Sequence, residues 1–210
     1  MSNCYTPINI CASRTTQLLA NGQPDYAANG PVVTHIPVSV GVSPQVTEGA
    51  LLEQLDGCGN ICASLQQPDR LSNINLAMNL CKRDYGLLGM ISNGPVFTSG
   101  SNAIGFALPD PELPILPVLF ETWQIAQEGS AGTGQYIHSV FPFVTWSMGD
   151  STMENGVRVE TWNGKVSPND IGFDAGGPFN DWPGQFEGPY MEFYDDALPA
   201  IVCGEQALAS

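Results

Sequence analysis

The sequence predicts an all-β protein with mainly antiparallel strands, and three observations support this fold class. Only 13% of the 210 residues are charged, so the chain is poor in the Lys, Glu and Arg residues that favour helices. The 23 glycines and 17 prolines also oppose long helices. Hydrophobic residues still make up 43% of the chain, and in several segments they alternate with polar residues, as in half-buried strands.

The alternation is cleanest at residues 73–80, where Ile74, Leu76, Met78 and Leu80 are expected to face inward and the asparagines outward. Other segments have the β-branched and aromatic composition that is typical of strands. They are residues 32–40, 117–125, 136–146, 157–162 and 190–194. Within residues 136–146, Pro142 predicts a kink or an edge position.

Four dipeptides are typical of turns, and we expect Asn155-Gly156 to form a hairpin turn. They are Asp56-Gly57, Asn93-Gly94, Asn155-Gly156 and Asn163-Gly164. A short turn is expected at residues 50–55.

One short flanking helix is expected at residues 84–91. Asp84 is a suitable N-cap for it, and Leu87, Leu88 and Ile91 follow at helical spacing.

The chain is interpreted as one β domain over residues 1–210. Residues 1–30 are expected to form an N-terminal extension, and residues 164–189 a long loop or arm that makes contacts with neighbours. The first twenty residues have neither a basic start nor an apolar core, so synthesis in the cytoplasm is expected.

The charge balance excludes whole classes of partner. Six basic residues against 21 acidic ones give a formal net charge of -15. A chain with so few basic residues cannot build a surface that neutralises phosphates, so nucleic-acid binding by contact is not expected. Adhesion to an anionic membrane is not expected, for the same reason.

Six cysteines leave three interpretations open: unligated core thiols, disulfides formed after release from the cell, and a zinc site. The cysteines are Cys4, Cys11, Cys58, Cys62, Cys81 and Cys203. Core thiols are favoured, because free cysteine is among the most buried residue types. A zinc site would use the Cys58-x-x-x-Cys62 spacing with thiolates from elsewhere in the chain. His35 and His138 are interpreted as packing residues or satisfied strand residues rather than ligands.

No catalytic motif occurs, so no enzyme, cofactor site or metal site is expected. The one catalytic alternative is a carboxylate pair, Glu121 and Glu160, of the kind that glycosidases use. Exposed tryptophans would allow carbohydrate binding. Trp123, Trp146 and Trp162 are instead expected in the core, and Trp182 at a surface or interface.

Three groups of short motifs follow one another over about residues 56–204. The first comprises Cys58-Gly-Asn-Ile-Cys-Ala, Pro68-Asp-Arg-Leu and Asn79-Leu-Cys-Lys-Arg-Asp84. The second comprises Val118-Leu-Phe-Glu-Thr-Trp123, the segment from Tyr136 to Trp146, and Glu154-Asn-Gly156. The third comprises Gly177-Pro-Phe-Asn-Asp-Trp-Pro183, Asp195-Asp-Ala-Leu-Pro199 and Cys203-Gly204. In this order they resemble the major tail proteins, or tail tube proteins, of long-tailed (siphovirus-type) phages that infect actinobacteria.

The resemblance implies a β-sandwich or β-barrel subunit with a short flanking helix. It implies hexameric rings that stack into a hollow tube, each subunit adding strands to a continuous barrel around a lumen through which genomic DNA passes. The implied partners are other copies of the chain and the tape measure, terminator and distal tail proteins, and the implied location is the virion tail. No catalytic or cofactor-binding residue comes with the resemblance.

Two alternatives are kept beside the tail tube interpretation. One is a head–tail connector, tail terminator or capsid decoration protein, which would form single rings or lattices rather than open tubes. The other is a carbohydrate-binding β-sandwich. For a tube, we also expect a sizeable share of the 21 acidic residues to face the lumen, where they would repel the DNA backbone.

Overall fold

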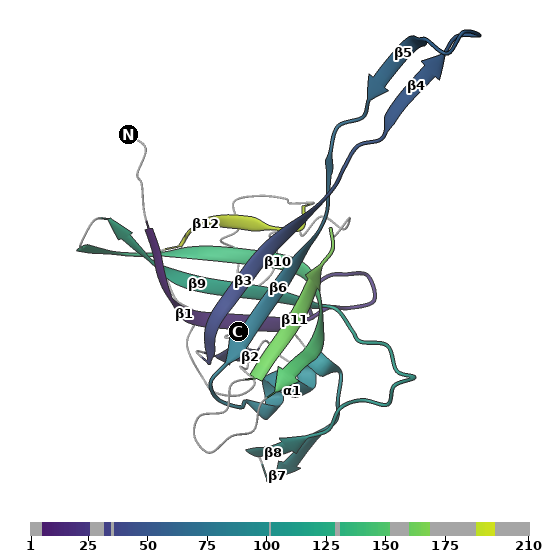
Figure 1. Cartoon of the computed structure of the whole chain (residues 1–210). Coiled ribbons are helices and arrows are strands. Elements are labelled where there is room, and N and C mark those ends of the chain that lie inside the picture. Colours follow the sequence, from purple (N-terminus) through teal and green to yellow (C-terminus); the bar gives the residue numbers. More distant parts are fainter. Residues whose placement is uncertain are drawn as a thin grey trace.

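The computed structural model describes residues 6–25, 32–34, 36–100, 102–128, 131–151, 160–168 and 188–195. These residues form strands β1–β12 and helix α1, which are labelled in Figure 1. The strands are β1 (Thr6–Gln17), β2 (Val32–Thr34), β3 (Pro37–Thr47), β4 (Leu51–Leu55), β5 (Ile61–Gln66), β6 (Arg70–Leu80), β7 (Val96–Ser99), β8 (Asn102–Phe106), β9 (Val118–Glu128), β10 (Ala131–Ser151), β11 (Glu160–Val166) and β12 (Met191–Asp195). The helix is α1 (Tyr85–Ser92).

The main sheet has the order β2-β1-β9-β10-β11-β6-β3, and β12 pairs with β10 beside this path. All of its strand pairs are antiparallel. The expected all-β fold class is therefore confirmed. Strand β10 belongs to both halves of the sheet: β9 and β12 pair with its residues up to Val144, and β11 pairs with it from Val144 onward. The pairing with β9 shifts register between Phe141 and Val144, where Pro142 predicts a kink.

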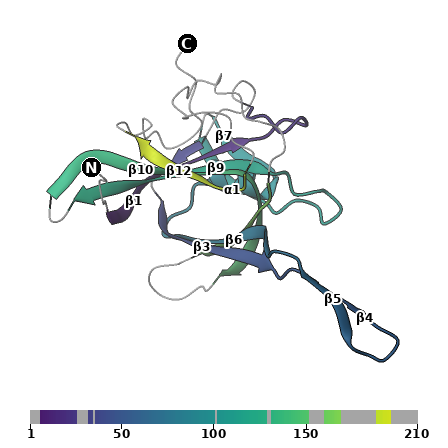
Figure 2. The same ribbon diagram turned by 90° about the horizontal axis from the view of Figure 1, so that it is seen from above.

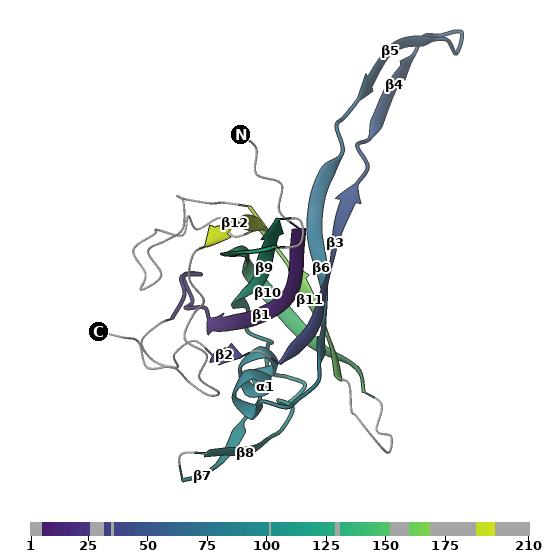
Figure 3. The same cartoon turned by 90° about the vertical axis from the view of Figure 1, so that its left-hand side faces the viewer.

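The sheet folds over on itself at β10 and encloses the main core between two layers. One layer contains β1, β9 and the first half of β10, and the other contains β3, β6 and β11 (Figures 2 and 3). Trp146 and Trp162 lie in this core, and the Phe120 and Trp146 rings meet edge to face at 5.1 Å. Helix α1 adds Leu87, Leu88 and Ile91 to the same cluster. The expectation that Trp123, Trp146 and Trp162 are buried is confirmed.

The prediction for residues 73–80 is confirmed in detail. All four inward residues are buried within β6, and the residues between them are exposed or half-buried. The helix prediction is also confirmed. The Asp84 carboxylate accepts hydrogen bonds from the N–H groups of Gly86 and Leu87, at 2.9 and 3.2 Å, which caps the helix.

Two predictions about the N-terminal half are wrong. Residues 32–40 form parts of two strands, β2 and β3, rather than one. The N-terminal extension expected at residues 1–30 contains β1, which lies inside the sheet between β2 and β9. Its residues 12–16 are buried, and β1 is paired with a strand along each edge.

Two expected turns are also wrong. Residues 51–55 form β4 rather than a turn, because they pair with β5. Asn163-Gly164 lies inside β11, so the first residues of the expected loop at 164–189, up to Val166, belong to a strand. Residues 169–187 lie outside the described residues, as do the expected Asn155-Gly156 turn and Trp182.

Gly164 is needed in β11 because the Trp146 ring packs directly over its Cα. A Cβ at this position would lie 2.9 Å from two atoms of that ring and 3.0 Å from Val144. We expect Gly164→Ala to lower the free energy of unfolding by about 1–3 kcal/mol, since neither neighbour can move without disturbing the core. Urea denaturation measures this change. Gly57→Ala is the matched control, because a Cβ there meets no atom within 4 Å. An equal effect of both changes would contradict the packing argument.

Candidate functional site

A buried cluster of charged and aromatic side chains joins β1, β9 and β10. Arg14 and Glu121 stand directly opposite each other in the β1–β9 register. The guanidinium donates to both carboxylate oxygens, at 2.5 Å from Nε to Oε2 and 2.6 Å from Nη2 to Oε1. His138 lies 3.1 Å from Glu121 Oε1 through its Nε2, and Arg14 packs over the Trp123 ring. Arg14 and Glu121 are 1% and 0% exposed, so this is an ion pair of the protein interior.

The environment of Glu121 favours its charged form. Burial alone would raise the pKa of this carboxyl. The Arg14 charge and the hydrogen bonds from His138 and Arg14 oppose that effect and lower the pKa to about 2. A general acid needs a proton near neutral pH, and this carboxyl holds none there. The interactions of Glu121 with Arg14 and His138 link the strands β1, β9 and β10.

Glu160, the other member of the expected carboxylate pair, belongs to a different cluster from Glu121. Glu121 is opposite Val140 of β10, whereas Glu160 is opposite Ser151, eleven residues further along that strand. Arg14 and His138 are the partners of the Glu121 carboxylate, and Arg83 is the partner of Glu160. Glu160 is buried and accepts a hydrogen bond from Arg83 at 3.2 Å. The structure therefore does not bring the two glutamates together.

His138 is a packing residue, as expected. Its ring stacks on Trp123 at 4.0 Å and contacts Phe193 of β12 at 4.6 Å. His35 lies outside the described residues.

The expectation that the cysteines are core thiols is wrong for the described ones. Cys58, Cys62 and Cys81 are exposed and Cys11 is half-buried, all with free thiols. Burial raises the pKa of the Cys11 thiol. Cys4 and Cys203 lie outside the described residues. Within the described ranges, no group of three or more His, Cys, Asp or Glu residues could hold a metal ion.

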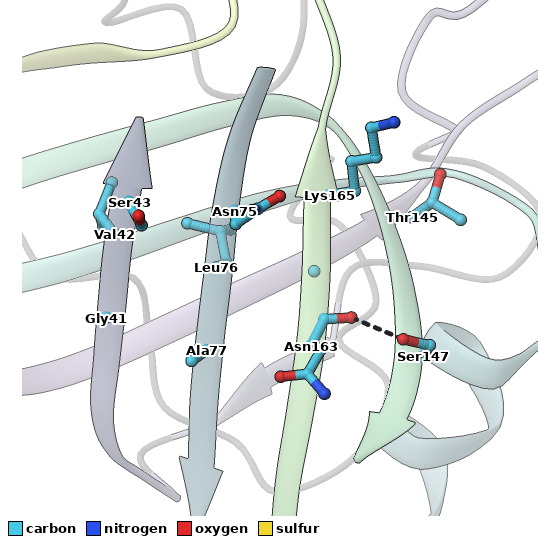
Figure 4. A pocket seen from close by; sticks show the side chains of 11 residues that line it. Gly41, Val42, Ser43, Asn75, Leu76, Ala77, Thr145, Ser147, Asn163 and Lys165 are labelled. Atoms are coloured by element: carbon cyan, nitrogen blue, oxygen red, sulfur yellow. Dashed lines mark hydrogen bonds between the residues drawn. The ribbon is translucent and has the colours of Figure 1, made fainter. Parts of the chain in front are cut away.

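The outer face of the sheet formed by β3, β6, β11 and the second half of β10 is hollowed over about 510 Å³. Figure 4 shows short polar side chains from these strands around the hollow, with the Ser147 hydroxyl donating to the Asn163 carbonyl at 3.2 Å. Amides, hydroxyls and small apolar groups make up its lining, and Lys165 is the one charged residue among the eleven that line it. The hollow thus offers many weak polar contacts and almost no charge.

The most prominent surface feature is a two-stranded hairpin, residues 48–69, which we call the arm. It contains β4 and β5, which pair with each other, and it projects beyond the sandwich as a continuation of β3 and β6 (Figures 1 and 3). Every residue of the arm is exposed except the half-buried Gly49. Five of its leucine and isoleucine side chains are more than half exposed. They are Leu51, Leu52, Leu55, Ile61 and Leu65.

This hairpin differs from the short turn expected at residues 50–55, although the sequence contains a signal for it. Two apolar stretches, residues 51–55 and 61–66, flank the turn residues Asp56-Gly57. The Asp56 carboxylate accepts hydrogen bonds from the N–H groups of Cys58 and Asn60, both at 2.8 Å, and these bonds shape the tip. That pattern is typical of a hairpin with a longer loop.

Specific bonds at the base of the arm hold it in line with the body. Gly49 N–H donates to the Asp69 carboxylate at 2.8 Å, and the Gln66 amide donates to the Gly49 carbonyl at 2.8 Å. The two strands approach so closely that a Cβ on Gly49 would lie 1.8 Å from the Gln67 carbonyl oxygen. The direction of the arm is therefore set by the backbone.

No family model and no curated protein matches this chain. Among the described helical residues, no segment is both long and apolar enough to cross a bilayer.

Proposed function

We propose that this chain is a structural protein that closes into rings, and that the rings stack into the tube of a phage tail. The observation that carries this proposal is the sheet of β3, β6, β11 and the second half of β10, which among the described strands ends in an open edge on each side. The ring number of six and the virion setting follow the resemblance in the sequence.

Strand β3 forms the first open edge. Its eleven residues include no charged side chain, and among the described strands only β6 pairs with it. The register shifts between Pro37 and Ser39 and between Gln45 and Val46, and Pro44 has no N–H, so the bare part of the edge is residues 39–43. Monomeric proteins protect such long edges with charges, bulges or covering segments, because a bare edge pairs with other chains. Beyond Val144, β10 forms the second edge, where its only described strand partner is β11.

The two edges differ, so pairing β3 of one copy with β10 of the next is a head-to-tail contact. Such a contact closes into a ring when a whole number of equal rotations, one from each copy to the next, makes a full turn. The strand pairing itself supplies main-chain hydrogen bonds, as in other cases of strand addition between chains. This arrangement would place a four-stranded sheet from each copy around a central lumen.

With the core on the inner face of this sheet, its hollowed outer face would line the lumen. The hollow on that face is lined by Lys165 and neutral groups, so it does not support the expectation that carboxylates line the lumen. A neutral amide and hydroxyl lining still makes few of the counterion-releasing contacts that hold DNA. Several carboxylates lie on the arm instead. They are Glu48, Glu53, Asp56 and Asp69.

Electron microscopy of the concentrated protein at low and high ionic strength tests the proposal. We expect rings and hollow tubes, with more assembly at high salt, because salt screens the repulsion between copies of net charge -15. Rings that never stack would favour a connector or terminator. Protein that stays monomeric under all these conditions would contradict the proposal.

A substitution at the open edge tests the mechanism of ring closure. Val42 of β3 is 46% exposed, so Val42→Lys is expected to leave the fold intact and to place a charge against the neighbouring copy. We expect this variant to remain monomeric by analytical ultracentrifugation. Leu19→Lys, at a residue 45% exposed outside the sheet edge, is the control and should assemble as the wild type does. Ring formation by Val42→Lys would show that β3 is not the contact.

A further inference from the structure

Four polar residues form a row across the hollowed face of the sheet. Asn75 of β6 stands opposite Ser43 of β3 on one side and opposite Lys165 of β11 on the other. Thr145 of β10 stands opposite Lys165 and completes the row. All four residues line the hollow of about 510 Å³, and Figure 4 shows Lys165 between Asn75 and Thr145. Polar side chains from four strands therefore meet at one level of this face.

The hydrogen bonds of Asn75 occupy its acceptor and leave its donor available. The Asn73 amide donates from Nδ2 to Oδ1 of Asn75 at 2.9 Å. The Ser72 hydroxyl in turn donates to Oδ1 of Asn73 at 3.1 Å, which favours this orientation of the Asn73 amide. Within the described ranges, no acceptor is bonded to the NH₂ group of Asn75. Asn75 can therefore donate to a molecule in the hollow.

Ser43 and Lys165 have the same polarity as Asn75. The Gln45 amide donates from Nε2 to the Ser43 hydroxyl oxygen at 3.0 Å, so the hydroxyl proton is available for a further acceptor. The Lys165 ammonium has only donors, and no carboxylate of the described residues lies within ion-pair distance of it. The row thus offers an ammonium, an amide NH₂ group and a hydroxyl as donors.

Such a set of donors around a positive charge favours an anion over a neutral molecule. None of the residues that line the hollow is acidic, although the chain has 21 acidic residues. Lysine, serine, threonine and asparagine are among the side chains that contact phosphate groups in nucleic-acid complexes. A phosphate group has more acceptor oxygens than a carboxylate, and they point in different directions, which suits donors from several strands.

We propose that this row is a binding site for a phosphate group, either as the free ion or as part of a phosphodiester chain. The Lys165 ammonium balances the charge, and Asn75 and Ser43 donate to the phosphate oxygens. The site lies within one copy, so it does not depend on the proposed tube. In a ring, the row would recur once in every copy, so a chain with six basic residues would still present a ring of ammonium groups.

The phosphorus NMR line width of inorganic phosphate measures binding to the full-length protein. At an ionic strength of about 0.15 M, which screens the net charge of -15, we expect broadening that saturates. Lys165→Gln is expected to weaken binding about tenfold, because a charge-assisted hydrogen bond is lost. Lys82→Gln changes an exposed lysine outside the hollow and should bind as the wild type does. An absence of broadening with the wild type, or equal broadening with Lys165→Gln, would overturn the proposal.

Asn75→Asp tests the donor argument with almost no change in side-chain size. It replaces the NH₂ group with a carboxylate oxygen, so we expect it to abolish phosphate binding. Asn102→Asp, an exposed change in β8, adds the same charge elsewhere and is the matched control. Sodium acetate should not displace phosphate from the wild type. Displacement by an equal concentration of acetate, or unchanged binding by Asn75→Asp, would refute a phosphate site.

A labelled oligothymidine, followed by fluorescence anisotropy, distinguishes the two sources of the phosphate group. Binding that Lys165→Gln weakens would assign the row to a phosphodiester chain, whereas binding of inorganic phosphate alone would assign it to the free ion. Oligothymidine binding that neither Lys165→Gln nor Asn75→Asp changes would contradict the proposal. Electron microscopy of the same samples reports on assembly separately, so phosphate binding without tubes would refute the proposed tube and leave this site standing.

Discussion

Arg14→Met is expected to lower the free energy of unfolding by about 3–5 kcal/mol, the largest single effect that the structure indicates. The substitution leaves the Glu121 carboxylate fully buried with His138 as its remaining described side-chain partner. Removing one member of a buried ion pair costs more than the pair contributes, because the other charge stays in a medium that solvates it poorly. Urea denaturation of the purified variant measures the loss.

Two comparisons separate this effect from the loss of a long side chain. Arg70→Met changes an exposed arginine at the start of β6 and should alter stability by no more than about 0.5 kcal/mol. The double variant Arg14→Met with Glu121→Met removes both charges and should recover much of the lost stability. A double variant less stable than Arg14→Met alone would contradict the explanation from uncompensated charge.

Acid is expected to remove a similar amount of stability through the same carboxyl. The pKa of Glu121 is lowered from 4.5 to about 2 in the folded protein. The unfolded state therefore binds this proton more readily, so the contribution is complete above about pH 4.5 and is lost as the pH falls toward 2. At about 1.4 kcal/mol for each pKa unit, the loss is about 3 kcal/mol.

Denaturation of the wild type and of Glu121→Gln from pH 7 to pH 2 measures this contribution. The neutral variant should be less stable at pH 7, where it leaves Arg14 buried without its carboxylate, and it should lose less stability in acid. Protonation of the other carboxyls in acid reduces the repulsion in a chain of net charge -15. This effect raises the stability of both proteins, so the difference between them reports on Glu121. Glu53→Gln, an exposed change on the arm, should follow the wild type. Parallel curves for the wild type and Glu121→Gln would contradict the prediction.

Local patterns predicted those parts of the fold that depend on near neighbours. The alternation in β6 has a period of two, and a strand places alternate residues on opposite faces whatever its partners are. The capping of α1 by Asp84 is equally local, because the bonded N–H groups lie two and three residues away. Both features could be predicted from about ten residues of sequence.

The sheet neighbours could not be predicted in this way. Strand β1 has no clean alternation that would place it inside a sheet, because residues 12–16 are buried on both faces and include polar side chains. Gly164 looked like part of a turn because the sequence does not show that Trp146 lies across it. In both cases the deciding contact comes from a strand far away in the chain.

The sequence by itself determined the all-β class, the cleanest strand and the capped helix, because these follow from periodicity and short-range hydrogen bonds. Only the tertiary structure decided the pairing of Arg14 with Glu121, 107 residues apart, and the exposure of the arm. Long-range register determines which charges meet and which apolar side chains stay uncovered. The apolar residues of the arm look like core residues in the sequence, and the described part of the structure leaves them exposed.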